Sequence, residues 1–432
     1  MFDVTHDTAR LWWSGAALLA FGGLSWARLR RAPRAKAPPC AVRVLYASQT
    51  GQAEAIARRT HARLIAGGID AGLASLADID AAALLNARTL LVVASTTGEG
   101  DAPDDGRAFE SVLAARPGLS GRDFAVLALG ERKYAAFCAF GLRVHDGLAA
   151  CGAKALGPCL TADDLDAATL RRWDDLADTL GAGAAPVEPE APPWTLSARE
   201  RLNPDGGAPL YRLRLVPPVT CEWQAGDLAE VGTKDGHRRD YSIATLPGEC
   251  HVELYVREAV GPDGLPGKGS GLLLHDTPVG GQIRLRLKSH KAFHAPAGDG
   301  PLLLIGAGSG LAGLRAHILA SRRRRPWLIY GERHPVRDGA LVAEAQGWLS
   351  ARALSRLSLA FSQAGDGTKT YVQDVLNAEG ARVYDHLIHD GAVLVCGGLD
   401  MGRAVERTLR GLMGDGWIDD ALASGRYRRD LY

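Results

Sequence analysis

A chain of 432 residues is too long for one ordinary hydrophobic core, so its length predicts two or three domains. Its 50 basic and 49 acidic residues nearly cancel, and no dense Lys/Arg stripe with interleaved aromatic residues occurs, which argues against a nucleic-acid partner. The short basic run 322–325 is typical of a solvated helix end. The seven cysteines show no CxxC or zinc-ligand spacing, which indicates free thiols in a reducing compartment and no metal site.

The first patterned segment is the uncharged stretch 11–27, which is rich in Leu, Ala, Trp and Gly. At ~1.5 Å per residue it reaches the lower limit for crossing a bilayer. Tryptophans lie near its ends and basic residues follow it, which predicts a single membrane helix with the remaining chain in the cytoplasm. A cleaved signal peptide is the alternative, although its basic residues should precede the apolar run. We therefore expect an anchor and tether over 1–40 and a single-pass location in the cell inner membrane.

Strands and helical stretches alternate from 41 to 183, which predicts a parallel sheet covered by helices. Three apolar runs, Val42–Tyr46, Leu90–Ala94 and Phe124–Leu129, are typical of buried parallel strands. Loops at the carboxyl ends of such strands converge on one ligand site. The first loop suits a phosphate at a helix N-terminus, and the third offers aromatic faces, so a flat phosphorylated cofactor is expected. The candidate residues are Ser48, Gln49, Thr50, Gly51, Gln52 and Ala53; Ser95, Thr96, Thr97 and Gly98; and Leu129, Gly130, Tyr134, Phe137 and Cys138.

The second half begins after a proline-rich linker at 184–195. Short β-rich runs separated by Gly/Pro turns over 196–297 predict a small antiparallel barrel. Alternating strands and helices return over 298–432. There a glycine-rich turn follows the strand 302–305 and precedes a helix, which suits a dinucleotide pyrophosphate, although tight strand–helix packing also selects glycine.

The order and spacing of these segments resemble the diflavin reductases, which include NADPH–cytochrome reductases and the flavoprotein subunit of sulfite reductase. The resemblance covers 41–432. It implies a flavodoxin-like FMN domain over 41–183, an FAD-binding barrel over 196–297 and an NADP-binding α/β domain over 298–432, with FMN, FAD and NADPH as cofactors. Only a few residues separate Val231 from Arg239, so the large connecting domain of bigger relatives is absent.

Carried over by position, the three loops of 41–183 would hold FMN. Tyr134 resembles the ring that stacks on the isoalloxazine, and Asp163 resembles a carboxylate near the ribityl end. Thr97 stands where many relatives carry an aromatic residue, so one face of FMN is expected to be less covered.

The resemblance also implies residues for the other two cofactors. For FAD they are Arg239, Tyr241 and Ser242 of an RxYS motif and Gly267, Lys268, Gly269 and Ser270 of a pyrophosphate loop. For NADPH they are Gly306, Gly308, Ser309 and Gly310 at the pyrophosphate, and Ser362, Gln363, Lys369, Tyr371 and Gln373 around the 2′-phosphate. Gln363 stands where relatives usually have arginine, and a neutral amide cannot supply a bidentate cation to a phosphate.

Four residues would line the hydride-transfer site, namely Ser242, Cys396, Asp430 and the terminal Tyr432, which would cover the FAD ring. For Cys396, a small buried strand-end residue without a chemical role is the alternative.

The resemblance implies a membrane-anchored flavoprotein oxidoreductase of the NADPH–haemoprotein reductase type. Electrons would pass from NADPH through FAD and FMN to a one-electron acceptor such as a haem protein. The alternatives are a sulfite-reductase-type flavoprotein component and a ferric-chelate reductase whose acceptor is a metal chelate. A non-enzymatic flavin-binding scaffold is disfavoured because the hydride-transfer residues are retained. Acidic residues near the FMN loops would either steer a basic partner or be ordinary solvated loop residues.

Overall fold

The computed structural model describes residues 38–48, 51–97, 100–103, 106–132, 135–185, 189–203, 207–233, 238–261, 264–321, 323–365 and 367–432. The chain divides into two compact units, with most residues up to 186 in the first and residues from 187 onward in the second.

The first unit is built on a six-stranded sheet in the order β2-β1-β3-β4-β5, with β6 also paired to β4. All of these pairings are parallel, and the order is that of a flavodoxin-like doubly wound fold. The flavodoxin-like part of the predicted fold class is therefore confirmed. The strands are β1 (Cys40–Ala47), β2 (Ala71–Ser75), β3 (Ala87–Ser95), β4 (Asp123–Gly130), β5 (Lys154–Ala155) and β6 (Leu160–Asp163).

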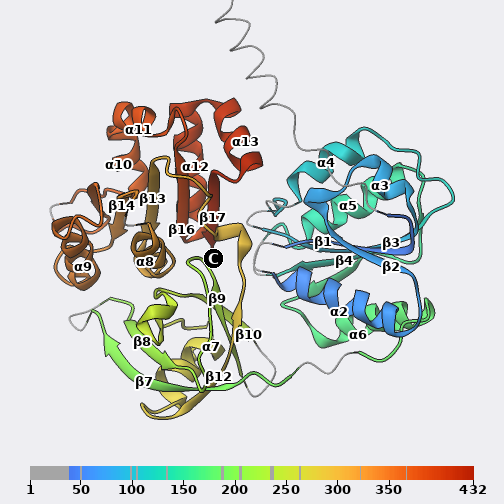
Figure 1. Ribbon diagram of the computed structural model, residues 1–432, viewed down its shortest axis with the longest axis horizontal. Coiled ribbons are helices and arrows are strands. Elements are labelled where there is room, and N and C mark those ends of the chain that lie inside the picture. Colours follow the sequence, from blue (N-terminus) through green and yellow to red (C-terminus); the bar gives the residue numbers. More distant parts are fainter. Residues whose placement is uncertain are drawn as a thin grey trace, which may run out of the picture. The chain divides into compact units, whose positions relative to one another are not determined.

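Helices cover both faces of this sheet, which is why β3 and β4 are apolar on both faces. Helices α2 and α6 lie on one face, and α3, α4 and α5 lie on the other (Figure 1). Their bounds are α2 (Gln52–Ala66), α3 (Ala81–Leu85), α4 (Arg107–Ala114), α5 (Ala139–Ala150) and α6 (Ala167–Thr179).

The second unit begins with a six-stranded antiparallel sheet in the order β10-β9-β12-β7-β8-β11. Its bounds are β7 (Pro193–Arg201), β8 (Leu210–Val216), β9 (Leu228–Gly232), β10 (Arg238–Ser242), β11 (Val252–Arg257) and β12 (Gln282–Lys288), with the short helix α7 (Lys268–Gly271) before β12. The predicted β-rich character is confirmed. The predicted barrel is not, because the pairings of the described residues follow an open path and do not join β10 to β11.

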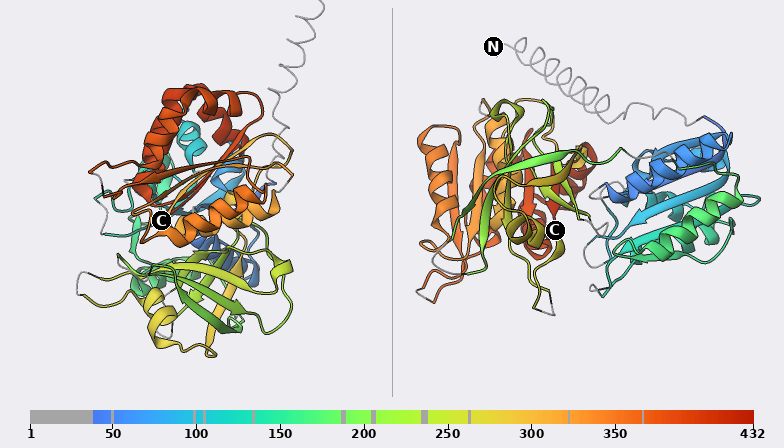
Figure 2. Two further views of the ribbon diagram at one scale, coloured as in Figure 1. Left: turned by 90° about the vertical axis from the view of Figure 1, so that its left-hand side faces the viewer. Right: turned by 90° about the horizontal axis from the view of Figure 1, so that it is seen from below.

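A five-stranded parallel sheet in the order β15-β14-β13-β16-β17 completes the second unit. It lies beside the antiparallel sheet in Figure 1 and in the left view of Figure 2. Helices α8 and α9 cover one face, and α10 to α13 cover the other. The strands are β13 (Leu302–Ala307), β14 (Trp327–Glu332), β15 (Arg356–Phe361), β16 (Ala392–Gly397) and β17 (Tyr427–Leu431). The helices are α8 (Leu311–Ala320), α9 (Gly339–Ser350), α10 (Val372–Ala378), α11 (Gly380–Leu387), α12 (Leu399–Met413) and α13 (Asp415–Ser424).

The predicted single-pass location in the inner membrane is corrected by the structure. In the part of the chain that is described, no helix has the length and apolar character needed to cross a bilayer. The stretch 11–27, on which the prediction rested, lies outside that part. The anchor therefore has no support among the described residues.

Candidate functional site

In the first unit, the carboxyl ends of four neighbouring parallel strands meet at one edge of the sheet. The strands β1, β3, β4 and β6 pair side by side, so the loops that follow them share this edge. The Ser95 hydroxyl donates to the Ala47 carbonyl at 3.1 Å, and the Thr96 amide donates to the Leu129 carbonyl at 3.0 Å. These bonds tie neighbouring strand ends together.

Thr96 carries the observation that best fits a bound group at this edge. Its Oγ1 atom is buried and has no hydrogen-bond partner among the described residues. Buried hydroxyls in folded proteins are nearly always paired, so an orphan at the convergence of these loops fits a polar ligand such as FMN. Four predicted FMN residues, Gln49, Thr50, Gly98 and Tyr134, lie outside the described residues.

Before helix α2 the chain turns through Gly51, whose φ of +80° favours glycine, and Gln52 and the fully buried Ala53 then open the helix. In the second loop, Thr97 closes a tight turn with Asp101. The Asp101 amide donates to the Thr97 carbonyl at 2.8 Å, and the Thr97 hydroxyl donates to the Asp101 carbonyl at 3.1 Å. The Thr97 side chain is thus engaged within its own loop and supplies no aromatic face.

The third loop is shaped by close packing around Cys138. A Cβ atom at Gly130 would lie 2.8 Å from the Cys138 amide nitrogen, so glycine is required there. Burial raises the pKa of the Cys138 thiol to about 12, which keeps it protonated and structural. Asp163 accepts from the Arg132 amide at 2.9 Å, and the Arg132 guanidinium lies 4.6 Å from the centre of the Phe137 ring. Asp163 therefore orders this loop through Arg132.

In the second unit, strand β10 and the loop 267–270 pack directly against each other, as the FAD prediction requires. A Cβ atom at Gly269 would lie 2.8 Å from the Tyr241 hydroxyl oxygen and 2.9 Å from Arg239 Cγ. Burial raises the pKa of Tyr241 to about 12, so it remains a neutral phenol. The Ser270 hydroxyl donates to the Gly267 carbonyl and accepts from the Ala259 amide, each at 3.2 Å, so it stabilises the loop itself. Lys268 is the first residue of α7.

Three predicted hydride-transfer residues, the buried Cys396 and Asp430 and the partly buried Ser242, form one cluster. The Ser242 hydroxyl donates to Asp430 Oδ2 at 2.6 Å, and the Cys396 thiol reaches the same oxygen at 3.6 Å. Cys396 and Asp430 face each other in the register of β16 and β17, whereas Ser242 ends β10 of the antiparallel sheet. Burial, reinforced by the neighbouring Asp430 carboxylate, raises the pKa of Cys396 well above its ordinary value. The sulfur therefore stays an S–H donor.

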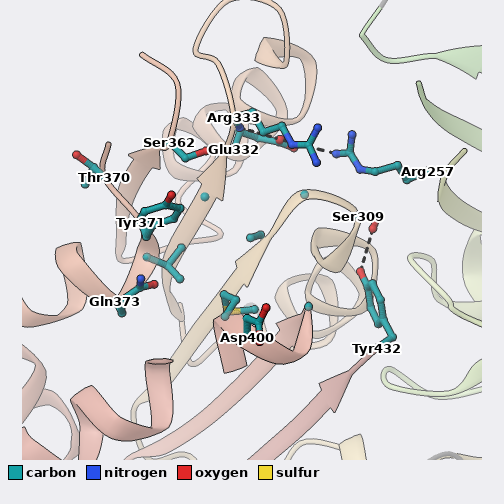
Figure 3. A pocket seen from close by; sticks show the side chains of 16 residues that line it. Arg257, Ser309, Glu332, Arg333, Ser362, Thr370, Tyr371, Gln373, Asp400 and Tyr432 are labelled. Carbon is teal, nitrogen blue, oxygen red and sulfur yellow. Dashed lines mark hydrogen bonds and ion pairs between the residues drawn. The ribbon is translucent and has the colours of Figure 1, made fainter. Parts of the chain in front are cut away.

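A cavity of about 510 Å³ opens beyond the carboxyl ends of the parallel sheet in the second unit (Figure 3). Tyr432 and Ser309 close one end of it, with their hydroxyl oxygens 2.9 Å apart. The volume lies within the range of small-molecule sites, and a nucleotide fits this position in an α/β sheet. The predicted residues that line the cavity are Gly308, Ser309, Ser362, Tyr371, Gln373 and Tyr432.

Four other predicted nucleotide residues do not line the cavity, namely Gly306, Gly310, Gln363 and Lys369. The two glycines have a packing reason instead. A Cβ atom would lie 3.0 Å from the Cys396 carbonyl oxygen at Gly306 and 2.2 Å from it at Gly310. These positions need glycine so that β13 and the turn after it can approach β16.

Several lining residues were missed from the sequence, above all Arg257, Glu332, Arg333 and Thr370. Glu332 is a buried carboxylate that accepts from the Tyr330 hydroxyl at 2.6 Å and lies 4.0 Å from Arg257. Burial raises its pKa. In nucleotide-binding α/β domains, the next strand after the glycine-rich turn often ends in an acidic residue. A search for this signal would have identified Glu332.

An ionic network joins the antiparallel sheet to the helices of the parallel sheet within this unit. Glu344 of α9 pairs with Arg212 of β8 and, at 3.0 Å, with Arg315 of α8. Arg315 also donates to the Ala244 carbonyl at 2.8 Å, two residues beyond Ser242. The network thus fixes Ser242 against the sheet that carries Cys396 and Asp430.

Comparison with known proteins gives one family match in the first unit and relatives that cover most of the chain. Residues 44–173 match the family model described as flavodoxin. The sulfite reductase [NADPH] flavoprotein alpha-component of Thiocapsa roseopersicina is 29% identical over 433 residues, covering 85% of this chain and 83% of that protein. The component of the same name from Klebsiella pneumoniae subsp. pneumoniae is 25% identical over 548 residues, covering 93% and 91%.

Over most of its length the chain is similar to flavoproteins of the diflavin reductase family. The resemblance predicted from the loops is thereby confirmed. The Thr96 edge lies within the region that matches flavodoxin, and the cavity and the Ser242–Asp430–Cys396 cluster both lie in the second unit.

Proposed function

We propose that this protein is the flavoprotein component of an NADPH-dependent sulfite reductase, with FMN, FAD and NADPH as cofactors. It moves electrons from NADPH through FAD and FMN to a haem-containing redox partner. A sulfite-reductase-type flavoprotein component is the alternative interpretation of the sequence. Relatives named as sulfite reductase components over most of their length favour it over a haemoprotein reductase of the cytochrome type. The Ser242–Asp430–Cys396 cluster is the observation that carries the proposal.

The cluster supports hydride transfer through the positions of its donors. The bound cofactors supply hydride acceptance and the split into single electrons. The Asp430 carboxylate orients the Ser242 hydroxyl and the Cys396 thiol, because one oxygen accepts from both. Only 6% of Asp430 is exposed, so water does not compete for these bonds.

Tyr432 controls access to the cavity in this proposal. It is 56% exposed; its amide donates to the Gly397 carbonyl at 3.2 Å, and among the described residues its hydroxyl pairs only with Ser309, so rotation of the side chain opens that end of the cavity at small cost. Arg239 and Tyr241 hold FAD on the antiparallel sheet, while Ser48, Thr96 and the loops beside them hold FMN in the first unit.

The test is flavin analysis of the purified full-length protein followed by anaerobic reduction with NADPH. We expect equal amounts of FMN and FAD, bleaching of both flavins by NADPH, and transfer to a haem acceptor that stops when FMN is removed. One flavin alone, or no bleaching, would refute the proposal. Sulfite reduction on addition of a sulfite reductase haem component would separate this function from that of a general haemoprotein reductase.

A further inference from the structure

The end of the cavity away from Tyr432 is lined by neutral polar side chains. Ser362, Thr370, Tyr371 and Gln373 lie on this side, and Arg257, Ser309 and Tyr432 lie on the other (Figure 3). We call the four residues the ribose end. Gln363 and Lys369 are exposed and stand outside the lining, so among the described residues neither contributes to the cavity wall at this end.

A buried carboxylate stands next to the ribose end. The Ser362 amide donates to the Glu332 carbonyl at 3.1 Å, and the Gln363 amide donates to the Arg333 carbonyl at 2.7 Å. These bonds hold the ends of β14 and β15 side by side. The Glu332 side chain lines the cavity from β14, so a phosphate near Ser362 would meet a nearby negative charge.

The two arginines in the cavity lining do not outweigh this negative charge. Arg257 donates to the Ala208 carbonyl at 2.8 Å and lies 4.0 Å from Glu332. Its Nη2 atom is also 3.3 Å from where a Cβ would stand on Gly308, which places it at the glycine-rich turn. Arg333 is the remaining cation of the described lining, and the carboxylates of Glu332 and Asp400 match the two arginines in number.

We propose that this cavity binds nicotinamide dinucleotides with and without a 2′-phosphate about equally well, so that the protein uses NADH as well as NADPH. The inference rests on the proposed function and deepens it. An arginine would form a bidentate, charge-assisted pair with a 2′-phosphate, and the amide of Gln363 cannot. The negative charge of Glu332 disfavours a bound 2′-phosphate and offsets the attraction between Arg333 and that phosphate. Glu332 thus sets nucleotide specificity from within the lining, and position 363, next to the lining residue Ser362, does so by lacking the arginine that could reach a 2′-phosphate.

Calorimetry with adenosine 2′,5′-bisphosphate and ADP tests this on the full-length flavoprotein without relying on turnover. We expect their dissociation constants to agree within about tenfold, and kcat/KM for NADPH and NADH to do the same. Gln363→Arg should tighten binding of the bisphosphate by about tenfold or more and leave ADP binding unchanged. Glu332→Gln keeps the hydrogen bond from Tyr330 and should also strengthen binding of the bisphosphate relative to ADP. Gln346→Arg, an exposed position on α9 outside the lining, is the matched control.

A wild-type preference for the bisphosphate beyond about tenfold would overturn the inference, as would a ratio unchanged by Gln363→Arg. If either of these results is found while NADPH still bleaches the flavins normally, only the inference fails and the proposed function is retained. Failure of both ligands to bind, together with no bleaching by either dinucleotide, would refute the proposed function, and the inference would fall with it.

Discussion

Replacement of Asp430 by asparagine tests the hydride-transfer cluster most directly. The substitution keeps the side-chain shape and one acceptor oxygen. It removes the negative charge of the carboxylate to which the Ser242 hydroxyl donates a hydrogen bond at 2.6 Å. A hydrogen bond to a charged group contributes about 1.5–3 kcal/mol. At about 1.4 kcal/mol per tenfold, flavin reduction by NADPH should slow about 10- to 150-fold if that orientation is needed only in the transition state.

The assay is anaerobic stopped-flow absorbance of the flavins, with the FAD content of each preparation measured beside it. Asp146→Asn is the matched control, because its side chain is 84% exposed and lies in the first unit. We expect the control to reduce at the wild-type rate. Wild-type kinetics in Asp430→Asn with a full complement of FAD would contradict the catalytic role of the cluster. A loss of rate that only tracks a loss of FAD would show a structural role.

Further predictions follow from packing and charge. Gly269→Ala should release FAD, measured by fluorescence of the filtrate, because the new methyl would lie 2.8 Å from the Tyr241 hydroxyl. Glu344→Gln should lower the free energy of unfolding by about 1 kcal/mol in guanidinium titration, because it removes a carboxylate shared by two partly buried arginines, which keep Glu253 and Glu249 as partners; an unchanged midpoint would contradict this. Burial alone would raise the pKa of Asp227, but hydrogen bonds, chiefly from His294 at 2.6 Å, lower it below the ordinary 3.8. Its stabilisation should be complete above that value and be lost as the pH falls below it, so Asp227→Asn should destabilise the protein at pH 7 and much less at pH ~3.

The strands were predictable where both of their faces are buried. The run Leu90–Ala94 is the centre of β3, Ala87–Ser95, and every residue of that run is buried. Such a run has one structural solution in an alternating α/β chain, namely a central parallel strand. The loops that follow these strands were therefore also placed correctly, because strand order alone brings their ends to one edge.

The glycine-rich turn shows where sequence pattern reaches its limit. Gly306 and Gly310 matched a pyrophosphate motif, yet both are required by the approach of the Cys396 carbonyl. Close approach of a backbone and close approach of a ligand both exclude a Cβ atom, so local sequence cannot separate them. Arg257 was missed for the opposite reason. It ends a strand of the antiparallel sheet, and only the packing of that sheet brings it to Glu332, 75 positions further along the chain.

The same packing decides whether the hydride-transfer cluster is preorganised. Asp430 and Cys396 belong to adjacent strands and keep their register by backbone pairing alone. Ser242 belongs to the other sheet, so its 2.6 Å bond to Asp430 depends on how the two sheets are held together. Arg315 contributes to that hold beside the Arg212–Glu344 pair, since it binds both Glu344 and the carbonyl of Ala244, two residues beyond Ser242. Arg315 is therefore a positioning residue: its loss would displace Ser242 while leaving the Cys396–Asp430 contact intact, and flavin reduction would slow without a change in the environment of the thiol.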